Sequence, residues 1–395
     1  MQPRTGDDAR RVLYYNHVGE LSGAEASLLT LVSNLTPDRF EPHVVAPLTG
    51  PFASALARQR IPCHPISAIR VRQTGNPLST ASSLMRLLTR RIQVGGVVQQ
   101  VRPHLLHANS LTAGIIATTW SLGMPPVVLH VRDLQFPRRA MQWAASGAEA
   151  IIAISECVKD AVVAAIPEAA TRIRVIYNGI DPTHFRPRRP CEQVRDMLGI
   201  GEGELLIGSV GQLVPWKRQD RFLEAAALIA AQVPHCRFII VGADMFGEHS
   251  DYVAALRAQA SGLGLARPVI WGGYRDDVAD LMAAMDIMVH TAENEPLGRV
   301  ILEALCVGTP CVAVDAAGPK EIIRNLESGM LTKPDARSLA TAAVTVLTRP
   351  RLAQALAQGG RERVLSGFSV RTMVEQTEDL YCDMLARKPT RRWPI

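Results

Sequence analysis

The sequence predicts an α/β protein built from two doubly wound domains, and three observations support this. Short apolar runs alternate with amphipathic stretches along the chain, as expected of βα repeats whose parallel strands are buried on both faces. A segment rich in Pro and Arg, 181–190, interrupts this alternation. The length of 395 residues suits two domains better than one.

The first half of the chain alternates predicted strands with predicted helices. The uncharged run 111–130 is interrupted by Pro and Gly, so it predicts a helix followed by a buried strand and not a membrane span. The strands are expected at 11–16, 42–47, 104–108, 127–131, 150–155 and 173–177, and the helices at 23–35, 78–101, 112–122 and 156–165.

The second half repeats the alternation. Its strands are expected at 205–211, 237–242, 268–272, 286–290 and 310–314, and its helices at 218–232, 249–263, 297–307 and 336–348, followed by a last helix at 370–385. We therefore expect a first domain over 1–185, a second over 186–369, and a terminal helical segment over 370–395 whose packing against the first domain is left open. Because ligands bind where parallel strands end, the site is expected in a cleft between the domains.

Composition excludes several classes of protein. The net charge of +6 favours phosphates or anionic lipids, and no nucleic-acid-binding signature is present, so nucleic acid is not an expected partner and no protein partner is predicted. Seven Cys residues without a Cys-x-x-Cys pair argue against a disulfide framework or a structural zinc site. The N-terminus lacks the apolar core of a secretory signal, which predicts a soluble cytoplasmic protein.

The most specific segment runs from Glu295 to Pro310. A helix starting near Leu297 would leave Glu295 just before its first turn and place Arg299 and Glu303 on one side. Gly298 would let a ligand approach the first-turn amides, which are a favourable site for a diphosphate. The alternative is a solvated Arg–Glu pair and a carboxylate that only complements the helix dipole. The opposite, apolar side would consist of Leu297, Val300, Ile301, Ala304 and Leu305.

This segment resembles the Glu-x7-Glu motif of the GT4 family of retaining glycosyltransferases, with Leu297 in place of the usual Phe. Further blocks that resemble the family lie at 17–29, 129–133, 153–160, 175–187 and 210–226. The resemblance implies a GT-B fold, in which two Rossmann-like doubly wound domains face a central cleft. It also implies transfer of a sugar, with retention, from a UDP- or GDP-sugar to an acceptor that the sequence does not identify.

The resemblance assigns donor-binding roles. Glu303 would hold the ribose hydroxyls, Glu295 would contact the donor sugar, and Lys217 would face the diphosphate. Gln212 stands where the family block has an Arg, so the phosphate site is one charge short. Arg218, Arg299 or a bound ion would then compensate.

Other candidates rest on weaker patterns. His130 ends a strand and, by resemblance, would hydrogen-bond the donor sugar, whereas a structural histidine is the alternative. Gly19 and Gly23 would bring loop amides close to the donor, or would simply serve a turn and a helix start. Tyr274 is a candidate contact for the nucleobase, or a surface aromatic.

No Asp-x-Asp motif is visible, so neither a metal ion nor another cofactor is expected. Lys217 and helix amides would stabilise the leaving diphosphate in a front-face displacement. An NAD-linked oxidoreductase is disfavoured because Gly-x-Gly-x-x-Gly is missing. A sugar epimerase of the same fold and a non-catalytic nucleotide-sugar-binding protein remain alternatives.

The acceptor is predicted only by class. The basic stretch 70–91 suggests a lipid-linked or anionic acceptor, with peripheral contact at the inner face of the membrane, and a solvated loop and helix is the alternative. A role in cell-envelope or glycan biosynthesis is expected.

Overall fold

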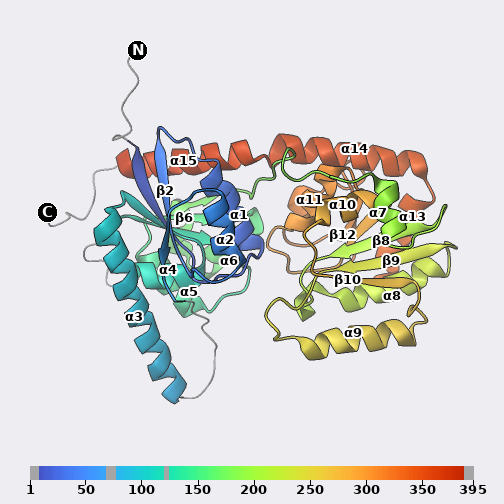
Figure 1. The fold of residues 1–395 in the computed structure, drawn as a ribbon, viewed down its shortest axis with the longest axis horizontal. Coiled ribbons are helices and arrows are strands. Elements are labelled where there is room, and N and C mark those ends of the chain that lie inside the picture. Colours follow the sequence, from blue (N-terminus) through green and yellow to red (C-terminus); the bar gives the residue numbers. More distant parts are fainter. Residues whose placement is uncertain (1–8, 68–76, 120–123, 387–395) are drawn as a thin grey trace, which may run out of the picture. The chain divides into compact units, whose positions relative to one another are not determined.

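The computed structural model describes residues 9–67, 77–119 and 124–386 (Figure 1). The chain divides into two compact units. One unit contains residues 1–179 together with 370–395, and the other contains 180–369. The first unit is therefore discontinuous in sequence, because the chain returns to it at Val370.

A parallel sheet of seven strands forms the centre of the first unit, in the order β3-β2-β1-β4-β5-β6-β7. All six predicted strands are present. The seventh, β3, has three residues, none of them fully buried, and is too short for a hydrophobic pattern to show. The strands are β1 (Arg10–Tyr15), β2 (Phe40–Ala46), β3 (Cys63–Pro65), β4 (Leu105–Ala108), β5 (Val127–Val131), β6 (Ala150–Ala153) and β7 (Ile173–Val175).

Helices cover both faces of this sheet, because successive side chains of a strand point to opposite faces. Tyr14 packs with α1 (Gly23–Ser33), α2 (Pro51–Arg58) and α15 (Val370–Ala386), and Tyr15 packs with α3 (Pro77–Val101) and α4 (Leu111–Thr118). The C-terminal helix α15 thus completes the core of the first unit. The remaining helices are α5 (Arg138–Ser146), α6 (Glu156–Ala165) and η1 (Pro167–Arg172).

Some predictions for this half need adjustment. Helices α2 and α5 were not predicted, and α4 ends at Thr118, whereas the prediction extended to residue 122. Residues 120–123 and the start of the basic stretch, 70–76, lie outside the described residues.

A second parallel sheet, of six strands, forms the centre of the other unit, in the order β10-β9-β8-β11-β12-β13. The five predicted strands are present, and the additional strand, β13, has only three partly buried residues. The strands are β8 (Leu205–Val210), β9 (Cys236–Val241), β10 (Val269–Gly273), β11 (Ile287–His290), β12 (Cys311–Val314) and β13 (Met330–Thr332).

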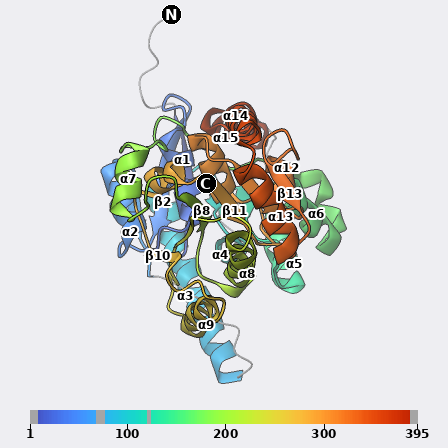
Figure 2. The ribbon, with the colours of Figure 1, turned by 90° about the vertical axis from the view of Figure 1, so that its right-hand side faces the viewer.

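Helices α8 (Gln219–Ala230) and α13 (Ala336–Leu347) lie side by side on one face of this sheet, with α9 (Ser250–Gly262) beside α8 (Figure 2). Helices α7 (Cys191–Met197) and α10 (Val278–Ala284) cover the other face. The remaining helices are α11 (Arg299–Val307), α12 (Pro319–Ile322), α14 (Pro350–Gly367) and η2 (Pro215–Lys217). Helices α7, α10, α12 and α14 were not predicted.

Both sheets have the topology in which the strand order reverses once, between β1 and β4 in the first and between β8 and β11 in the second. Ligands of such folds bind where the carboxyl ends of these strands meet. The predicted class, two Rossmann-like doubly wound domains, is confirmed by these sheets. Within the described part of the chain, no helix combines the length and the apolar character that a membrane crossing requires.

Candidate active site

Two loops at the switch point of the second sheet form a charged cluster. The loop after β8 carries Lys217, and the segment after β11 carries Glu295. The Lys217 ammonium forms an ion pair with the Glu295 carboxylate. His290, the last residue of β11, places its Nε2 3.1 Å from the same carboxylate oxygen. All three side chains are largely buried, so a salt-bridged cluster of low solvent exposure lies where a ligand is expected.

Glycines shape the loop that carries Lys217. Gly211 follows β8 with φ of 151°. A Cβ at Gly242 would lie 1.8 Å from the Gly211 carbonyl oxygen, so only glycine permits this approach of two backbones. The Thr291 hydroxyl donates a 2.8 Å hydrogen bond to the Lys217 carbonyl. The position of Lys217 is thereby tied to the residue that follows β11.

Helix α11 begins at Arg299, with Gly298 as its N-cap at φ of 101°, a left-handed conformation that glycine adopts without strain. The prediction that Leu297 and Val300 belong to the buried helical face was wrong: Leu297 precedes the helix and Val300 is only partly buried. Leu297 is nevertheless buried, at 1% exposure. Its backbone lies so close to Gly318 that a Cβ there would be 2.3 Å from the Leu297 Cα.

The two carboxylates of the motif have opposite pKa shifts. Burial alone would raise the pKa of Glu295, but the Lys217 charge and the His290 hydrogen bond outweigh it and lower that pKa to about 2. Burial raises the pKa of Glu303, and Arg299, 3.3 Å away, offsets this only in part. Glu295 is therefore a fixed anion at neutral pH.

The structure also shows the contacts of Gln212 and of the two arginines expected to compensate for it. The Gln212 carbonyl accepts a 2.8 Å hydrogen bond from the Gln219 amide. Arg218 pairs with Asp220 at 2.9 Å and with Glu293 at 3.5 Å. Since Arg299 is paired with Glu303, both arginines expected to compensate for Gln212 already have carboxylate partners.

Tyr274 follows β10, two strands away from β8 in the sheet, and its side chain is 53% exposed. It does not belong to the Lys217–Glu295 cluster.

His130 belongs to a separate buried cluster in the first unit. Its Nδ1 lies 3.0 Å from Nε2 of His107 and 3.2 Å from Nη2 of Arg132. Burial, followed by the Arg132 charge, lowers the pKa of His130 well below its usual value, and the same causes lower that of His107 to about 3. Both imidazoles are therefore neutral at pH 7.

The two predicted glycines lie near the start of α1. A Cβ at Gly19 would be 2.2 Å from the Thr49 carbonyl oxygen, so the contact between these loops already requires glycine there. Gly23 is the first residue of α1, behind the Ser22 cap, whose backbone N–H donates to the Glu25 carboxylate at 3.2 Å. The packing thus gives Gly19 a structural reason, and Gly23 lies at a helix start.

Several residues of these clusters were missed by the sequence analysis. They are polar residues that end a strand or directly follow one, and that signal could have found His290, Arg132 and Asn109. Arg132 donates to Asn109 Oδ1 at 2.8 Å and to Asn178 Oδ1 at 3.2 Å. Asn178 also accepts from Ser27 at 2.7 Å.

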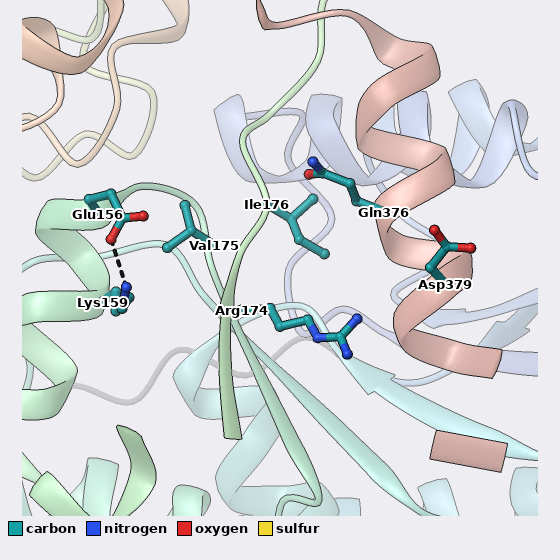
Figure 3. A pocket seen from close by; sticks show the side chains of 7 residues that line it. All are labelled: Glu156, Lys159, Arg174, Val175, Ile176, Gln376 and Asp379. Carbon is teal, nitrogen blue, oxygen red and sulfur yellow. Dashed lines mark hydrogen bonds and ion pairs between the residues drawn. The ribbon is translucent and has the colours of Figure 1, made fainter. Parts of the chain in front are cut away.

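A cavity of about 360 Å³ lies elsewhere in the first unit, among α6, β7 and α15 (Figure 3). Two basic and two acidic side chains line it, Lys159, Arg174, Glu156 and Asp379. Lys159 pairs with Glu156 at 2.9 Å, and Arg174 pairs with Asp383 outside the lining. None of the predicted site residues lines it. Across the described ranges, no three His, Cys, Asp or Glu side chains are grouped as a metal site would need.

Comparison with known proteins places the chain among glycosyltransferases. Residues 21–184 match the family model described as Glycosyltransferase Family 4, and residues 192–363 match the one described as Glycosyl transferases group 1. A crystal structure of HepE from Anabaena in complex with UDP-glucose is similar over 95% of this chain and all of that one, at 28% identity and a TM-score of 0.81.

Curated proteins that are similar in sequence also include glycosyltransferases. The UDP-Gal:alpha-D-GlcNAc-diphosphoundecaprenol alpha-1,3-galactosyltransferase of Escherichia coli is 24% identical over 78% of this chain and 82% of its own length. The N-acetyl-alpha-D-glucosaminyl L-malate synthase of Bacillus anthracis is 28% identical over 54% of either chain. The match with that synthase, and with EpsD of Bacillus subtilis, spans about half of each relative's length. The two family models and the HepE fold together show that this chain belongs to the GT4-type, group 1 glycosyltransferases of GT-B fold.

Proposed function

We propose that this protein is a retaining glycosyltransferase that transfers a sugar from a nucleoside diphosphate sugar to an acceptor. The observation that carries the proposal is the Lys217–Glu295–His290 cluster beside the N-terminus of α11, at the switch point of the second sheet. The first unit, predicted as domain 1–185, would bind the acceptor, and the second, predicted as 186–369, would bind the donor.

Lys217 and the first-turn amides of α11 would bind the diphosphate. Helix N-termini favour anions because the first backbone N–H groups have no partner within the helix and the positive end of the helix dipole lies there. Gly298 has no Cβ to keep a phosphate oxygen away from these amides. Because Lys217 pairs with Glu295 just before the N-terminus of α11, its charge would stabilise the negative charge that develops when the glycosidic C–O bond to phosphate breaks.

The carboxylates would hold the hydroxyl groups of the donor. Glu295, ionised at neutral pH, only accepts hydrogen bonds and would receive them from the sugar. Glu303 would accept from the two ribose hydroxyls, a charge-assisted arrangement that is stronger than a neutral one. Leu297, through an apolar contact, and Gln212 also belong to the predicted donor site.

Retention of configuration would follow from a front-face displacement. The acceptor hydroxyl attacks the anomeric carbon on the side from which the diphosphate leaves. One phosphate oxygen takes the acceptor proton while the anomeric C–O bond to phosphate breaks. This route needs no protein nucleophile and no metal ion or other cofactor, and Lys217 supplies the charge that the departing phosphate requires.

Two donors deserve a first test, UDP-glucose and GDP-mannose. The HepE complexes contain UDP and UDP-glucose, and another relative, from Mycobacterium tuberculosis, is a GDP-mannose-dependent alpha-mannosyltransferase. A nucleotide that binds the folded protein raises its melting temperature by mass action, so UDP and GDP can be compared directly. The nucleotide that stabilises the protein then identifies the donor class.

We further propose a lipid-linked acceptor in cell-envelope glycan synthesis. The E. coli relative is named for a diphosphoundecaprenol acceptor. Helix α3 exposes Met85 and Ile92 (65% and 73%) in a segment that also contains Arg90 and Arg91, which would suit peripheral contact with an anionic, inner membrane face. Sedimentation with phosphatidylglycerol vesicles but not with phosphatidylcholine vesicles is the expected result.

The deciding experiment incubates the protein with each donor and follows the products by NMR. Slow release of free sugar in the α-configuration, together with the nucleoside diphosphate, supports a retaining transferase. An epimerised sugar would instead establish the epimerase alternative. Binding of the nucleotide without any turnover, with lipid extract present as acceptor, would establish a binding protein.

A further inference from the structure

A chain of buried side chains in the first unit ends at His130. Tyr14, His107 and His130 lie on β1, β4 and β5, and all three point to the sheet face that α15 covers, as does Tyr381 from α15 itself. The Tyr14 and Tyr381 hydroxyls are 3.2 Å apart, the Tyr381 hydroxyl lies 2.6 Å from His107 Nδ1, and His107 Nε2 lies 3.0 Å from His130 Nδ1. No member of this chain is more than 4% exposed.

Arg132 and Tyr381, which contact the two ends of the His107–His130 pair, together set the direction of its hydrogen bonds. A guanidinium only donates, and its Nη2 lies 3.2 Å from His130 Nδ1, so Nδ1 accepts. His107 must then donate from Nε2 to the same Nδ1, which leaves His107 Nδ1 as an acceptor for the Tyr381 hydroxyl. The Tyr381 oxygen in turn accepts from Tyr14.

The proton of His130 therefore resides on Nε2. This atom is buried, and no hydrogen-bond partner for it exists among the residues that the structure describes. An unpaired buried donor costs free energy, whereas the other polar side-chain atoms of Tyr14, Tyr381, His107 and His130 have hydrogen-bond partners. A ligand oxygen is the natural partner of such a group.

We propose that Tyr381 and His107, together with Arg132, are positioning residues that hold His130 as a neutral Nε2–H donor toward a sugar oxygen of the donor substrate. The proposal rests on the proposed glycosyl transfer. His130 in this state donates a hydrogen bond and cannot accept the acceptor's proton at Nε2. The C-terminal helix thus contributes to the reaction through a tyrosine that itself touches no substrate.

The first test reads the tautomer without any substrate. Histidine ¹⁵N NMR distinguishes Nδ1–H, Nε2–H and charged imidazole, and a His130→Gln variant assigns the signal. We expect a single Nε2–H form of His130 that does not titrate between about pH 5 and 8. An Nδ1–H or a charged His130 overturns the proposal.

The second test uses two conservative variants. Tyr381→Phe removes only the hydroxyl donor to His107 and keeps the ring that packs edge-on against Phe40. We expect mixed His130 tautomers and a threefold to tenfold lower kcat for donor hydrolysis, about the value of one hydrogen bond, with unchanged nucleotide affinity. Tyr14→Phe is the matched control, because Tyr381 can still donate to His107, and wild-type values are expected.

Three outcomes are decisive. Wild-type kcat and His130 signals in folded Tyr381→Phe overturn the positioning role. Equal losses in Tyr14→Phe and Tyr381→Phe also overturn it, since they would reflect packing of the hydroxyl pair. If the wild-type protein shows the Nε2–H tautomer but neither hydrolyses nor transfers from any donor, the proposed function fails while the hydrogen-bond chain stands.

Discussion

Lys217 and Glu295, 78 residues apart in sequence, form a largely buried ion pair at the switch point of the second sheet. Each belongs to a different loop, and each is predicted to face a different part of the donor. In the proposed donor site, this pair would couple the residue that faces the diphosphate to the residue that contacts the sugar before any ligand binds.

Removing Lys217 should damage both stability and activity. Lys217→Ala leaves the Glu295 charge buried with only His290 beside it, so a loss of about 3–5 kcal/mol in the free energy of unfolding is expected. The Lys217→Ala/Glu295→Ala double variant should recover much of this stability but no turnover. Denaturant unfolding of the single and double variants measures the first effect, and donor hydrolysis measures the second.

Lys217→Arg is the matched control for charge. It retains the cation but not the compact ammonium geometry, so partial activity is expected. Parental nucleotide affinity and turnover in Lys217→Ala would place the phosphate site elsewhere.

Glu303→Ala should weaken donor binding by about 1.5–3 kcal/mol, the value of a hydrogen bond to a charged group, with a smaller effect on folding. Isothermal titration with the nucleotide is the measurement. Arg299→Ala is the control, because it removes the ion-pair partner of Glu303 but leaves the carboxylate. Unchanged affinity in folded Glu303→Ala would exclude this carboxylate from the site.

Gln212→Arg should tighten binding of the nucleoside diphosphate product. Arg218 and Arg299 already pair with carboxylates, so an added cation near Lys217 would strengthen the phosphate site. Tighter product binding also slows release, and turnover need not rise with affinity. The test compares product affinity for the variant and for Gln212→Lys. Weaker binding in both variants would show that this side chain lies away from the phosphates.

His130→Ala should lower turnover while leaving nucleotide affinity nearly unchanged, since an interaction made mainly in the transition state affects kcat and kcat/KM together. Steady-state kinetics with the true donor, alongside nucleotide titration, provide the measurement. His64→Ala, on the edge strand β3, serves as the control in the same unit. A variant at position 130 with wild-type turnover contradicts the assignment.

The first unit should lose stability in mild acid. The pKa of His107 falls from 6.5 to about 3 on folding, so below about pH 6.5 the unfolded chain takes up a proton that the folded one refuses. The contribution of this histidine to the free energy of unfolding is thus fully present above the pKa of the unfolded chain. It decreases between pH 6.5 and 3, by about 1.4 kcal/mol per pH unit for each such histidine.

His130, whose pKa is also lowered, should add to this slope. Hydrogen exchange of the β4 and β5 amides at several pH values measures the effect. His107→Gln should reduce the slope. A slope in His107→Gln equal to that of the wild type would contradict the prediction.

Periodicity predicted all strands of more than three residues, and long-range packing explains what it missed. Helix α14 contains Gly359 and Gly360, a pair that disfavours helix by propensity. In the structure a Cβ at Gly360 would lie 2.5 Å from Leu305 Cδ2, and one at Gly359 would lie 2.1 Å from the Glu327 carbonyl oxygen. Both glycines are needed for this helix to pack, which no local pattern reveals.

The candidate site was predicted in the same uneven way. Glu295, Glu303 and Lys217 belong to contiguous blocks that resemble a known family. The partners that determine their protonation or orientation, such as His290, and Tyr381 in the other cluster, come from distant segments. Their proximity to the predicted residues is apparent only in the folded structure, where the strands pair and the helices pack on them.

The return of the chain to the first unit at Val370 has a consequence for synthesis on the ribosome. Residues 180–369 form a continuous segment and can fold as soon as they emerge. The first unit, although its earlier part is synthesised first, lacks α15 until residues 370–386 are made, so Tyr14 and His107 remain without Tyr381. At translation rates of roughly 5–20 residues per second this delay is on the order of 10–40 s. During that interval the apolar face that α15 will cover is open, and it is where a nascent-chain chaperone would bind.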